Sequence, residues 1–404
     1  MHDIPQSDSL QKETAEQPQL RQSLRDMQNP KSEETKEQKL ERLLETRKII
    51  AEAKSKEITF SQPILRQKED AVFFPKTINV IQGKAGVHKS RLAETICSAL
   101  LRKSDYNKDL LGFKADVLNR FAVVYVDTER NFADQLPYAL QQIQKKAGYA
   151  IEDEVKDFDF ISLLEFDREE RFEMLNVYLE KVRKEFITHI FIVLDVVTDC
   201  ISNFNDTKDS MKLIDMMNKS INHFDVTFLC LIHENPGNTD KARGHLGTEI
   251  MNKASTVIQV GFEKDSDQTP MDIIKVNYLK CRSSKKHEPF YVQYSDTEKG
   301  LVLASPEVIR EAMDRKKVKA DNESLTEYLA TMLTEPTSKG ELFEMLKKEM
   351  KCSNRTLEDR MKEIIESKFV FNDANGSPCI LEKKLEDKKV IFFLTQTTVN
   401  DLLF

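Results

Sequence analysis

The stretch INVIQGKAGVHKSRLAETI, residues 78–96, constrains the fold of this chain more than any other. An apolar run leads into a glycine-bearing loop, and the loop leads through Lys89 and Ser90 into an amphipathic segment. This order predicts a buried strand, a tight turn and a helix whose positive end faces the turn. We expect a chain built around such a unit to have an α/β core.

The loop itself follows the spacing G-x-x-x-x-G-K-[ST] everywhere except the sixth position, where His88 stands in place of glycine. In loops of this spacing, backbone N–H groups wrap phosphates, the lysine neutralises phosphate charge and the hydroxyl contacts Mg²⁺. A phosphate-binding site is therefore predicted, formed by Gly83, Lys84, Ala85, Gly86, Val87, His88, Lys89, Ser90 and Arg91.

Three further apolar runs end in polar side chains that could serve the same site. FAVVYVD runs into Asp127-Thr128-Glu129, HIFIVLD ends in Asp195, and VTFLCLI is followed by His233. A single carboxylate after a strand is usually a solvated loop residue. Because the carboxyl ends of parallel strands meet at one edge of a sheet, several such ends beside a phosphate loop favour a common site. Asp195 is placed to hold a Mg²⁺-bound water, together with Ser90.

Eight β-rich runs between residues 76 and 305 alternate with polar helical segments, which indicates a mostly parallel sheet flanked by helices. The last three runs lack intervening helices, so we expect an antiparallel extension at one edge. We assign residues 59–305 to this domain.

Over about 76–300, these strands and strand-end residues resemble the RecA-like ATPases, in particular the hexameric helicase branch of RepA and DnaB type. The resemblance implies a RecA-like fold, ATP and Mg²⁺ as cofactors, and self-association into a ring, expected to be a hexamer. It assigns Glu129 as the base that orients attacking water and His233 as the sensor of the γ-phosphate. It also implies that Lys280 and Arg282 reach into the neighbouring subunit's ATP, although a K-x-R spacing alone is common on any basic surface.

Two loop residues depart from the pattern of that family. Histidine is one of the better non-glycine residues at positive φ, so His88 is compatible with a binding loop, and its ring could donate a hydrogen bond beside the phosphates. A loop that binds nucleotide without turnover is the alternative. Lys84 resembles the early lysine of partition-type ATPases, which acts across a dimer, but Glu129 and the K-x-R pair fit the RecA-like pattern better.

Two loops, residues 202–210 and 235–247, follow the third and fourth strands. In the helicases that the chain resembles, such loops line the central pore and grip single-stranded DNA. Lys241, Arg243 and His245 are suited to phosphate contacts there. An ordinary surface loop is the alternative.

After a charged linker helix at 306–322, residues 323–404 read as three helices and a hairpin around Asn375-Gly376, which resembles a winged helix-turn-helix. Its third helix opens with Ser353 as N-cap and would turn Asn354, Arg355 and Arg360 toward duplex DNA. Neighbouring glutamates leave protein docking as the alternative. The side chains expected to face inward are Leu325, Tyr328, Leu329, Met332, Leu342, Met345, Leu346, Leu357, Met361, Ile364 and Ile365.

Residues 1–58 lack glycine and aromatic residues, so we expect a disordered tail that runs into one amphipathic helix. This helix would dock on the core or a neighbouring subunit, or would remain solvated without a partner. The six scattered cysteines, the absence of a signal sequence or apolar span, and the 32% of charged residues lead us to expect a soluble cytoplasmic protein with reduced thiols and no membrane contact. The net charge of −7 confines any DNA contact to local basic patches.

The leading hypothesis is an ATP-dependent DNA motor that acts in replication or mobilisation of a plasmid or mobile element. One alternative is a DNA-stimulated ATPase of the same fold that regulates recombination or transposition without unwinding. The other is a nucleotide-sensing DNA-binding regulator that holds ATP without hydrolysis.

Overall fold

The computed structural model describes residues 35–58, 60–115, 120–236, 241–266, 269–316, 321–350 and 352–397. The chain divides into two compact units. The first contains the residues up to Phe262 and the segment Asp272–Ala304, and the second contains Glu263–Met271 and the residues from Ser305 onward. The expected N-terminal tail, residues 1–34, lies outside the described residues.

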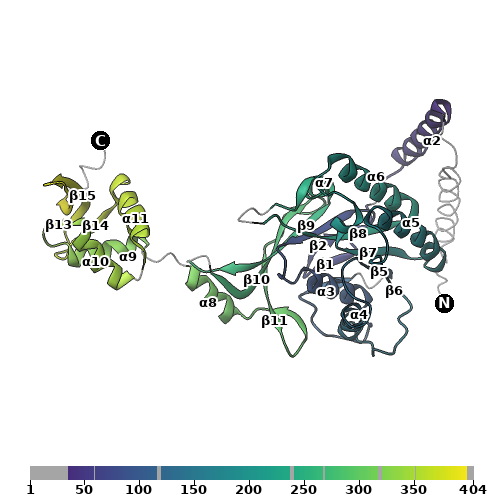
Figure 1. The fold of residues 1–404 in the computed structure, drawn as a ribbon, viewed down its shortest axis with the longest axis horizontal. Coiled ribbons are helices and arrows are strands. Elements are labelled where there is room, and N and C mark those ends of the chain that lie inside the picture. The colour runs from purple at the N-terminus through teal and green to yellow at the C-terminus, as the bar shows by residue number, and fades with distance from the viewer. Residues whose placement is uncertain are drawn as a thin grey trace, which may run out of the picture. The chain divides into compact units, whose positions relative to one another are not determined.

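A nine-stranded sheet of order β12-β11-β10-β9-β3-β8-β7-β5-β6 dominates the first unit (Figure 1). The six strands from β9 to β6 pair in parallel with their neighbours. This confirms the predicted fold class, an α/β fold with a mostly parallel sheet flanked by helices. The strands are β3 (Ile78–Gly83), β5 (Phe121–Asp127), β6 (Phe158–Ser162), β7 (His189–Asp195), β8 (Val226–His233), β9 (Thr256–Lys264), β10 (Pro270–Cys281), β11 (Phe290–Ser295) and β12 (Gly300–Leu303).

The extension at the edge of the sheet starts from β9, which pairs in parallel with β3 on one side and has β10 as its neighbour on the other. The parallel pairing with β3 arises because helix α7 (Gly244–Lys253) carries the chain back along the sheet before β9 starts. Beyond β9, β10 pairs antiparallel with β11 and β11 with β12, as expected for the extension, and β12 has no counterpart in the prediction.

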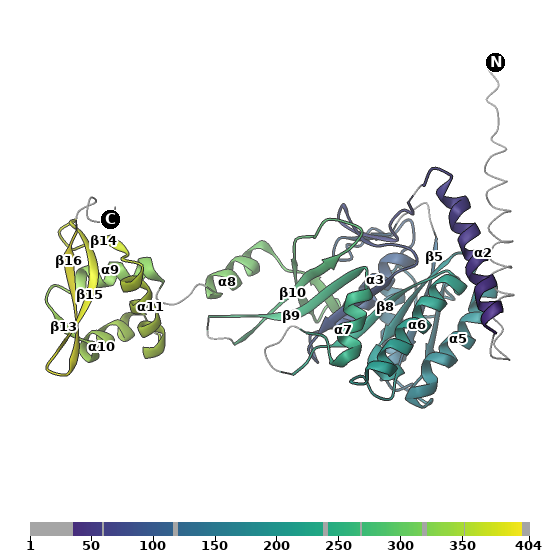
Figure 2. The same cartoon turned by 90° about the horizontal axis from the view of Figure 1, so that it is seen from above.

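Helices cover both faces of the sheet. In Figures 1 and 2, α3 (Lys89–Leu101) and α4 (Gln135–Lys146) lie on one face, and α5 (Arg168–Glu185), α6 (Thr207–Phe224) and α7 lie on the other. Successive side chains of a strand point to opposite faces, so β5 contributes to two separate cores. Phe121, Val123 and Tyr125 pack on the α3 side, whereas Ala122, Val124 and Val126 pack on the α5–α6 side.

A small sheet of order β2-β1-β4 also belongs to the first unit and was not predicted. It consists of β1 (Leu65–Gln67), β2 (Asp70–Phe73) and β4 (Phe113–Ala115). Strands of three or four residues are too short to show an alternating pattern in the sequence. A short 3-10 helix, η1 (Val197–Cys200), follows β7.

The second unit contains α8 (Pro306–Lys316), three further helices and a four-stranded sheet of order β13-β16-β15-β14. Ser353 caps the third helix of the module by accepting a hydrogen bond from Thr356 N, as predicted. Two hairpins follow that helix: β14–β15, around Asn375-Gly376, and the longer β15–β16. The elements are α9 (Asn322–Met332), β13 (Thr337–Ser338), α10 (Lys339–Met350), α11 (Asn354–Glu366), β14 (Val370–Asn372), β15 (Pro378–Glu386) and β16 (Lys389–Gln396).

The core of this module contains the expected side chains with one exception. Met345 of α10 is 38% exposed, and Phe343 is buried instead. The inward stripe of α10 is rotated because the Phe343 ring stacks on Phe392 of β16, at 6.2 Å between centroids. The other predicted residues are buried or partly buried, namely Leu325, Tyr328, Leu329, Met332, Leu342, Leu346, Leu357, Met361, Ile364 and Ile365.

The expected N-terminal helix is α2 (Lys36–Lys54), which begins with a capping box between Thr35 and Gln38. It carries no buried residue, and Leu43 is 67% exposed. Docking on the core is therefore not observed among the described residues, and docking on another subunit stays a prediction. The six cysteines are free thiols, as expected. Within the described part of the chain, no helix combines the length and apolarity needed to cross a membrane.

Candidate active site

The loop predicted to bind phosphate joins β3 to α3. Gly86 and His88 have φ angles of +78° and +66°, so His88 adopts the left-handed conformation expected of a residue that replaces glycine. A Cβ atom on Gly86 would meet nothing within 4 Å, but one on Gly83 would lie 2.3 Å from the carbonyl oxygen of Val260. Gly83 is therefore required by close packing, and Gly86 is favoured by its backbone angle.

The imidazole of His88 packs on the edge of the sheet. It stacks on the ring of Tyr294, on β11, with 5.1 Å between ring centroids and an interplanar angle of 16°. The ring of Phe262, on β9, meets the imidazole edge-on, with 6.2 Å between ring centroids. Partial burial, with a smaller contribution from Arg91, lowers the pKa of His88 below its usual value. The ring is consequently neutral near pH 7 and anchors the loop to β11.

The amino end of α3 suits an anion. His88 is its N-cap residue, but its side chain makes no capping hydrogen bond. The first-turn N–H groups of a helix have no partner within the helix, and the helix dipole favours negative charge there. Ser90 and Arg91 are half-buried in this first turn, and Arg91 forms an ion pair of 2.8 Å with Glu94. These features fit the phosphates of a nucleotide.

Lys89 is buried and points back into the loop. Its Nζ donates hydrogen bonds to the carbonyl oxygens of Gly83, at 3.0 Å, and Lys84, at 2.9 Å. It also lies 3.2 Å from Nδ1 of His233. Burial lowers the pKa of Lys89, whereas the carboxylates of Asp195, Glu129 and Glu234 act in the opposite direction. Three acidic groups thus surround the one buried ammonium of the loop.

His233 connects Lys89 to Glu129. Because the Lys89 ammonium can only donate, Nδ1 of His233 accepts, and the ring proton is on Nε2. That nitrogen lies 3.9 Å from Oε1 of Glu129, whose side chain is half exposed. The interaction with His233 lowers the pKa of Glu129, against an opposing contribution from burial. The ends of β5 and β8 therefore bring Glu129 and His233 to the loop lysine.

Asp195 lies in the same row as Asp127, at the adjacent ends of β7 and β5. It is 4% exposed, and the hydroxyl of Tyr125 donates a hydrogen bond of 2.8 Å to its Oδ2. The peptide bond between Asp195 and Val196 is cis. The four strand ends predicted to converge belong to β3, β8, β7 and β5, which are consecutive in the sheet.

Arg130, which the sequence analysis did not single out, holds this acidic cluster together. Its guanidinium pairs with Asp195 at 3.2 Å, Asp127 at 3.0 Å and the buried Glu94 at 3.3 Å. Burial alone would lower the pKa of Arg130, but Tyr125, Asp195 and Glu94 raise it above its usual value, so it stays charged. An acidic residue in the apolar stretch of α3 was the available sequence signal for this cluster.

Glu234 is a second residue that the sequence analysis did not identify. It is 8% exposed and accepts hydrogen bonds from the side-chain amides of Gln82, at 2.9 Å, and Gln259, at 2.8 Å. These two glutamines belong to β3, the neighbour of β8, and β9, the next strand beyond it, so Glu234 ties the end of β8 to both.

The structure places Lys280 and Arg282 at the carboxyl end of α7. Nζ of Lys280 donates to the carbonyl oxygens of Met251 and Asn252 at 2.8 and 2.9 Å, and the guanidinium of Arg282 donates to Asn252 O at 2.9 Å. Cations are favourable at the carboxyl end of a helix. The hydrogen bonds of these two side chains among the described residues are therefore with α7 and not with the phosphate loop.

The two loops expected to contact DNA lie against each other. The guanidinium of Arg243 lies over the Phe204 ring at 4.7 Å, and the carbonyl oxygen of Phe204 accepts from Leu246 N. The backbone N–H of Arg243 donates to His233 O at 2.8 Å, so the second loop is tied to the end of β8. Lys241 and His245 are exposed. Residues 237–240 of this loop lie outside the described residues.

In the second unit, the residues predicted to contact DNA differ in their surroundings. Asn354 and Arg355 are exposed at the start of α11. Arg360 is half-buried and forms an ion pair of 2.6 Å with Glu363, one turn further along the helix. Arg355 is therefore the more available cation of this helix.

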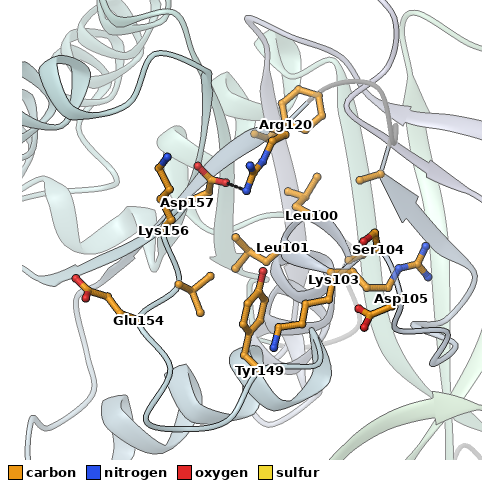
Figure 3. A pocket seen from close by; sticks show the side chains of 15 residues that line it. Leu100, Leu101, Lys103, Ser104, Asp105, Arg120, Tyr149, Glu154, Lys156 and Asp157 are labelled. Carbon is orange, nitrogen blue, oxygen red and sulfur yellow. Dashed lines mark hydrogen bonds and ion pairs between the residues drawn. The ribbon is translucent and has the colours of Figure 1, made fainter.

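A separate hollow of about 610 Å³ lies at the other end of α3 (Figure 3). Lys103 extends over the ring of Tyr149 at 4.4 Å, and Arg120 pairs with Asp157 at 2.6 Å. Leu100 and Leu101 of α3 line its wall. Because it contains none of the residues at the amino end of α3, this hollow is distinct from the candidate active site.

Among the described residues, no group of three or more His, Cys, Asp and Glu side chains could hold a metal ion by itself. Ser90 and Asp195 would therefore need phosphate oxygens and water to complete a Mg²⁺ shell, which is how Mg²⁺ is bound with nucleotides.

No protein-family model and no curated protein matches the chain. One similar solved structure is a crystal structure of the RadB recombinase. The TM-score is 0.38 and the identity 13%, over 57% of this chain and 92% of that chain.

Proposed function

We propose that the chain is a Mg²⁺-dependent ATPase of the RecA-like class. The observation that carries the proposal is the linkage of Lys89, His233 and Glu129 beside an uncapped helix end. A phosphate-loop lysine, a polar strand-end residue and a carboxylate are the groups that phosphoryl transfer to water requires.

Each group has a task that follows from its position. The loop amides and the amino end of α3 would hold the β- and γ-phosphates, and Lys89 would exchange its two loop carbonyls for phosphate oxygens. Glu129 is half exposed and ionised, so it can accept a proton from, and orient, the attacking water. Ser90 and Asp195 would hold Mg²⁺, which supplies charge neutralisation on the phosphates.

His233 supports a coupling between this chemistry and DNA. Its ring contacts Lys89, and its carbonyl oxygen accepts a hydrogen bond from Arg243, in the loop that carries Lys241 and His245. If a γ-phosphate displaced the imidazole of His233, the movement would be transmitted through the His233 backbone to the loop that carries Lys241, Arg243 and His245. We propose that the ATPase is an oligomeric DNA motor, a ring helicase that acts in replication or mobilisation of a plasmid or mobile element, with single-stranded DNA in its pore.

One observation favours a second candidate, a DNA-stimulated ATPase that does not unwind. Lys280 and Arg282 would have to release three hydrogen bonds to α7 before they could reach a neighbouring subunit's nucleotide. A chain that keeps these hydrogen bonds would hydrolyse ATP without assembling into an oligomeric ring.

Steady phosphate release by the full chain, with and without single-stranded DNA, tests the ATPase. We expect Glu129→Gln to lower the turnover by about 10²-fold or more while nucleotide still binds, because a general base contributes on this scale. The exposed Glu165→Gln is the control and should leave turnover unchanged. Unchanged turnover in Glu129→Gln would refute the role of this base.

Strand displacement and mass measurements separate the two candidates. A motor should displace a strand and form a larger assembly with ATP and DNA. Arg282→Ala should then lose turnover even at high protein concentration. Phosphate release without displacement, and without any loss in Arg282→Ala, would favour the non-unwinding ATPase.

A further inference from the structure

Arg130 contacts three buried carboxylates near the phosphate loop. Glu94, Asp127 and Asp195 are 0%, 1% and 4% exposed, and each lies on a different element, namely α3, β5 and β7. Buried carboxylates are costly unless a paired charge and hydrogen bonds compensate them. The guanidinium provides this compensation with its planar set of donors, which a lysine ammonium cannot reproduce.

The contacts of Arg130 fix one oxygen of Asp195. Oδ2 receives the Tyr125 hydroxyl at 2.8 Å and Nη2 of Arg130 at 3.2 Å, and Nη1 of Arg130 also donates to the Tyr125 oxygen at 3.1 Å. These three groups form a closed triangle at Oδ2. The triangle therefore sets the orientation of the Asp195 carboxylate.

The same guanidinium fixes the turn that carries Glu129. Oδ1 of Asp127 accepts hydrogen bonds from the backbone N–H groups of Glu129, at 3.0 Å, and Arg130, at 2.6 Å. Oδ2 of Asp127 is held by Nη1 of Arg130 at 3.0 Å. Because both oxygens of Asp127 are engaged, the backbone at Glu129 is held at the end of β5.

Glu94 anchors the arrangement on the helix that starts at Lys89. Oε1 of Glu94 pairs with Arg130, and Oε2 pairs with Arg91 at 2.8 Å. Arg130 therefore braces α3, whose first turn holds Lys89 and Ser90, against the strand ends that hold Glu129 and Asp195. Both halves of the candidate site are connected through one side chain.

We propose that Arg130 is a positioning residue, anchored by Glu94, that orients Asp195 for the metal and holds the turn of Glu129. The proposal rests on the proposed function, since it concerns the residues that would hold Mg²⁺ and orient water. Arg130 touches neither nucleotide nor metal in this role and acts through the two carboxylates.

The test compares the Mg²⁺ dependence of Arg130→Lys with that of the wild-type chain. The substitution retains the charge but cannot satisfy three carboxylates and a hydroxyl at once. Loss of groups that orient metal ligands costs about 10–100-fold in metal affinity or activity. We expect the Mg²⁺ concentration for half-maximal binding of a fluorescent ATP analogue to rise by about that factor. Turnover should recover in part at high Mg²⁺.

Two further variants keep the inference testable. Glu94→Gln leaves the contact between Arg130 and Asp195 in place but removes the anchor, so it should shift the Mg²⁺ dependence in the same direction by a smaller factor. Arg183→Lys alters another buried arginine, which donates to the backbone carbonyls of Thr188, just before β7, and Phe224, just before β8. Asp195 stands at the opposite end of β7. This control should leave the Mg²⁺ dependence unchanged.

The outcomes separate this inference from the proposed function. If Arg130→Lys and Glu94→Gln bind nucleotide with the same Mg²⁺ dependence as the wild-type chain, the role of Arg130 is overturned and the ATPase proposal stays intact. A wild-type chain that binds no nucleotide at any Mg²⁺ concentration would overturn both. Equal shifts in Arg183→Lys would reduce the effect to a general loss of stability and would also overturn the positioning role.

Discussion

The stack between His88 and Tyr294 leads to a prediction that separates two physical effects at one position. His88→Ala removes the ring but keeps a Cβ atom in the left-handed conformation at φ +66°. His88→Gly removes the ring and also relieves the backbone, because glycine adopts positive φ without steric cost. The two variants lack the same contacts with Tyr294 and Phe262, so they differ mainly in the backbone.

The sizes of both effects can be worked out from the geometry. A residue with a Cβ atom in this conformation costs about 1–2 kcal/mol relative to glycine. An aromatic pair contributes about 0.5–1.5 kcal/mol beyond its buried area, and the separation of 5.1 Å at 16° is that of an offset stack. We expect His88→Gly to be more stable than His88→Ala by about 1 kcal/mol. The coupling between His88→Ala and Tyr294→Ala should be about 0.5–1.5 kcal/mol.

Calorimetric unfolding of the full chain measures both quantities, because the two units can unfold in separate transitions. One kcal/mol corresponds to a shift of about 2–4 °C for a unit of 150–250 residues. Phe160→Ala, combined with Tyr294→Ala, is the control. Phe160 is 48% exposed on β6, at the opposite edge of the sheet from β11, and should show no coupling. Additive effects of His88→Ala and Tyr294→Ala, or an alanine variant as stable as the glycine variant, would refute the reasoning.

Four other substitutions test the site and the second unit. Gly83→Ala should lower the free energy of unfolding of the first unit by about 1–3 kcal/mol, because its Cβ would lie 2.3 Å from a backbone carbonyl oxygen of β9. An unchanged unfolding transition in calorimetry would contradict this close packing. His233→Ala should move the acid limb of ATP turnover to higher pH. The interaction with His233 lowers the pKa of Glu129, so in the wild-type chain the Glu129 carboxylate becomes protonated only at a pH below the usual glutamate range. An unchanged acid limb in the pH–rate profile would contradict this contact. Arg355→Ala should weaken duplex DNA binding and reduce its salt dependence, since each lost phosphate contact lowers the slope by about one. Arg360→Ala should have a smaller effect because its guanidinium is paired; equal losses in fluorescence anisotropy would show that the pair opens on DNA.

The sequence predicts the parallel core well because strands buried on both faces appear as uninterrupted apolar runs. All residues of β5, from Phe121 to Asp127, are buried, and all of β3 are buried as well. Such runs cannot show on their own which neighbour a strand will pair with. The placement of β9 beside β3 depends on the path of α7, which no local pattern encodes.

The sequence allowed the site residues at the ends of strands to be predicted. It did not reveal contacts between side chains of different helices and strands. The positions of Glu129, Asp195 and His233 follow from parallel strands that end at one edge. The contact of Arg130 with Glu94 joins residues 36 positions apart on a helix and a strand end, and it leaves no periodic signal. The hydrogen bonds of Lys280 and Arg282 to α7 were likewise not foreseen, because a resemblance to a family does not reveal local partners.

The register between β5 and β7 also limits how this chain can change. Tyr125 and Asp127 point to the layer of α3, and Asp127 lies opposite Asp195 in the pairing. A deletion of a single residue within β5 would turn the tyrosine hydroxyl into the opposite layer, and Oδ2 of Asp195 would lose the hydrogen bond from Tyr125. Insertions and deletions in this strand are therefore tolerated only in pairs, so the length of β5 should vary in steps of two among descendants that keep the same chemistry.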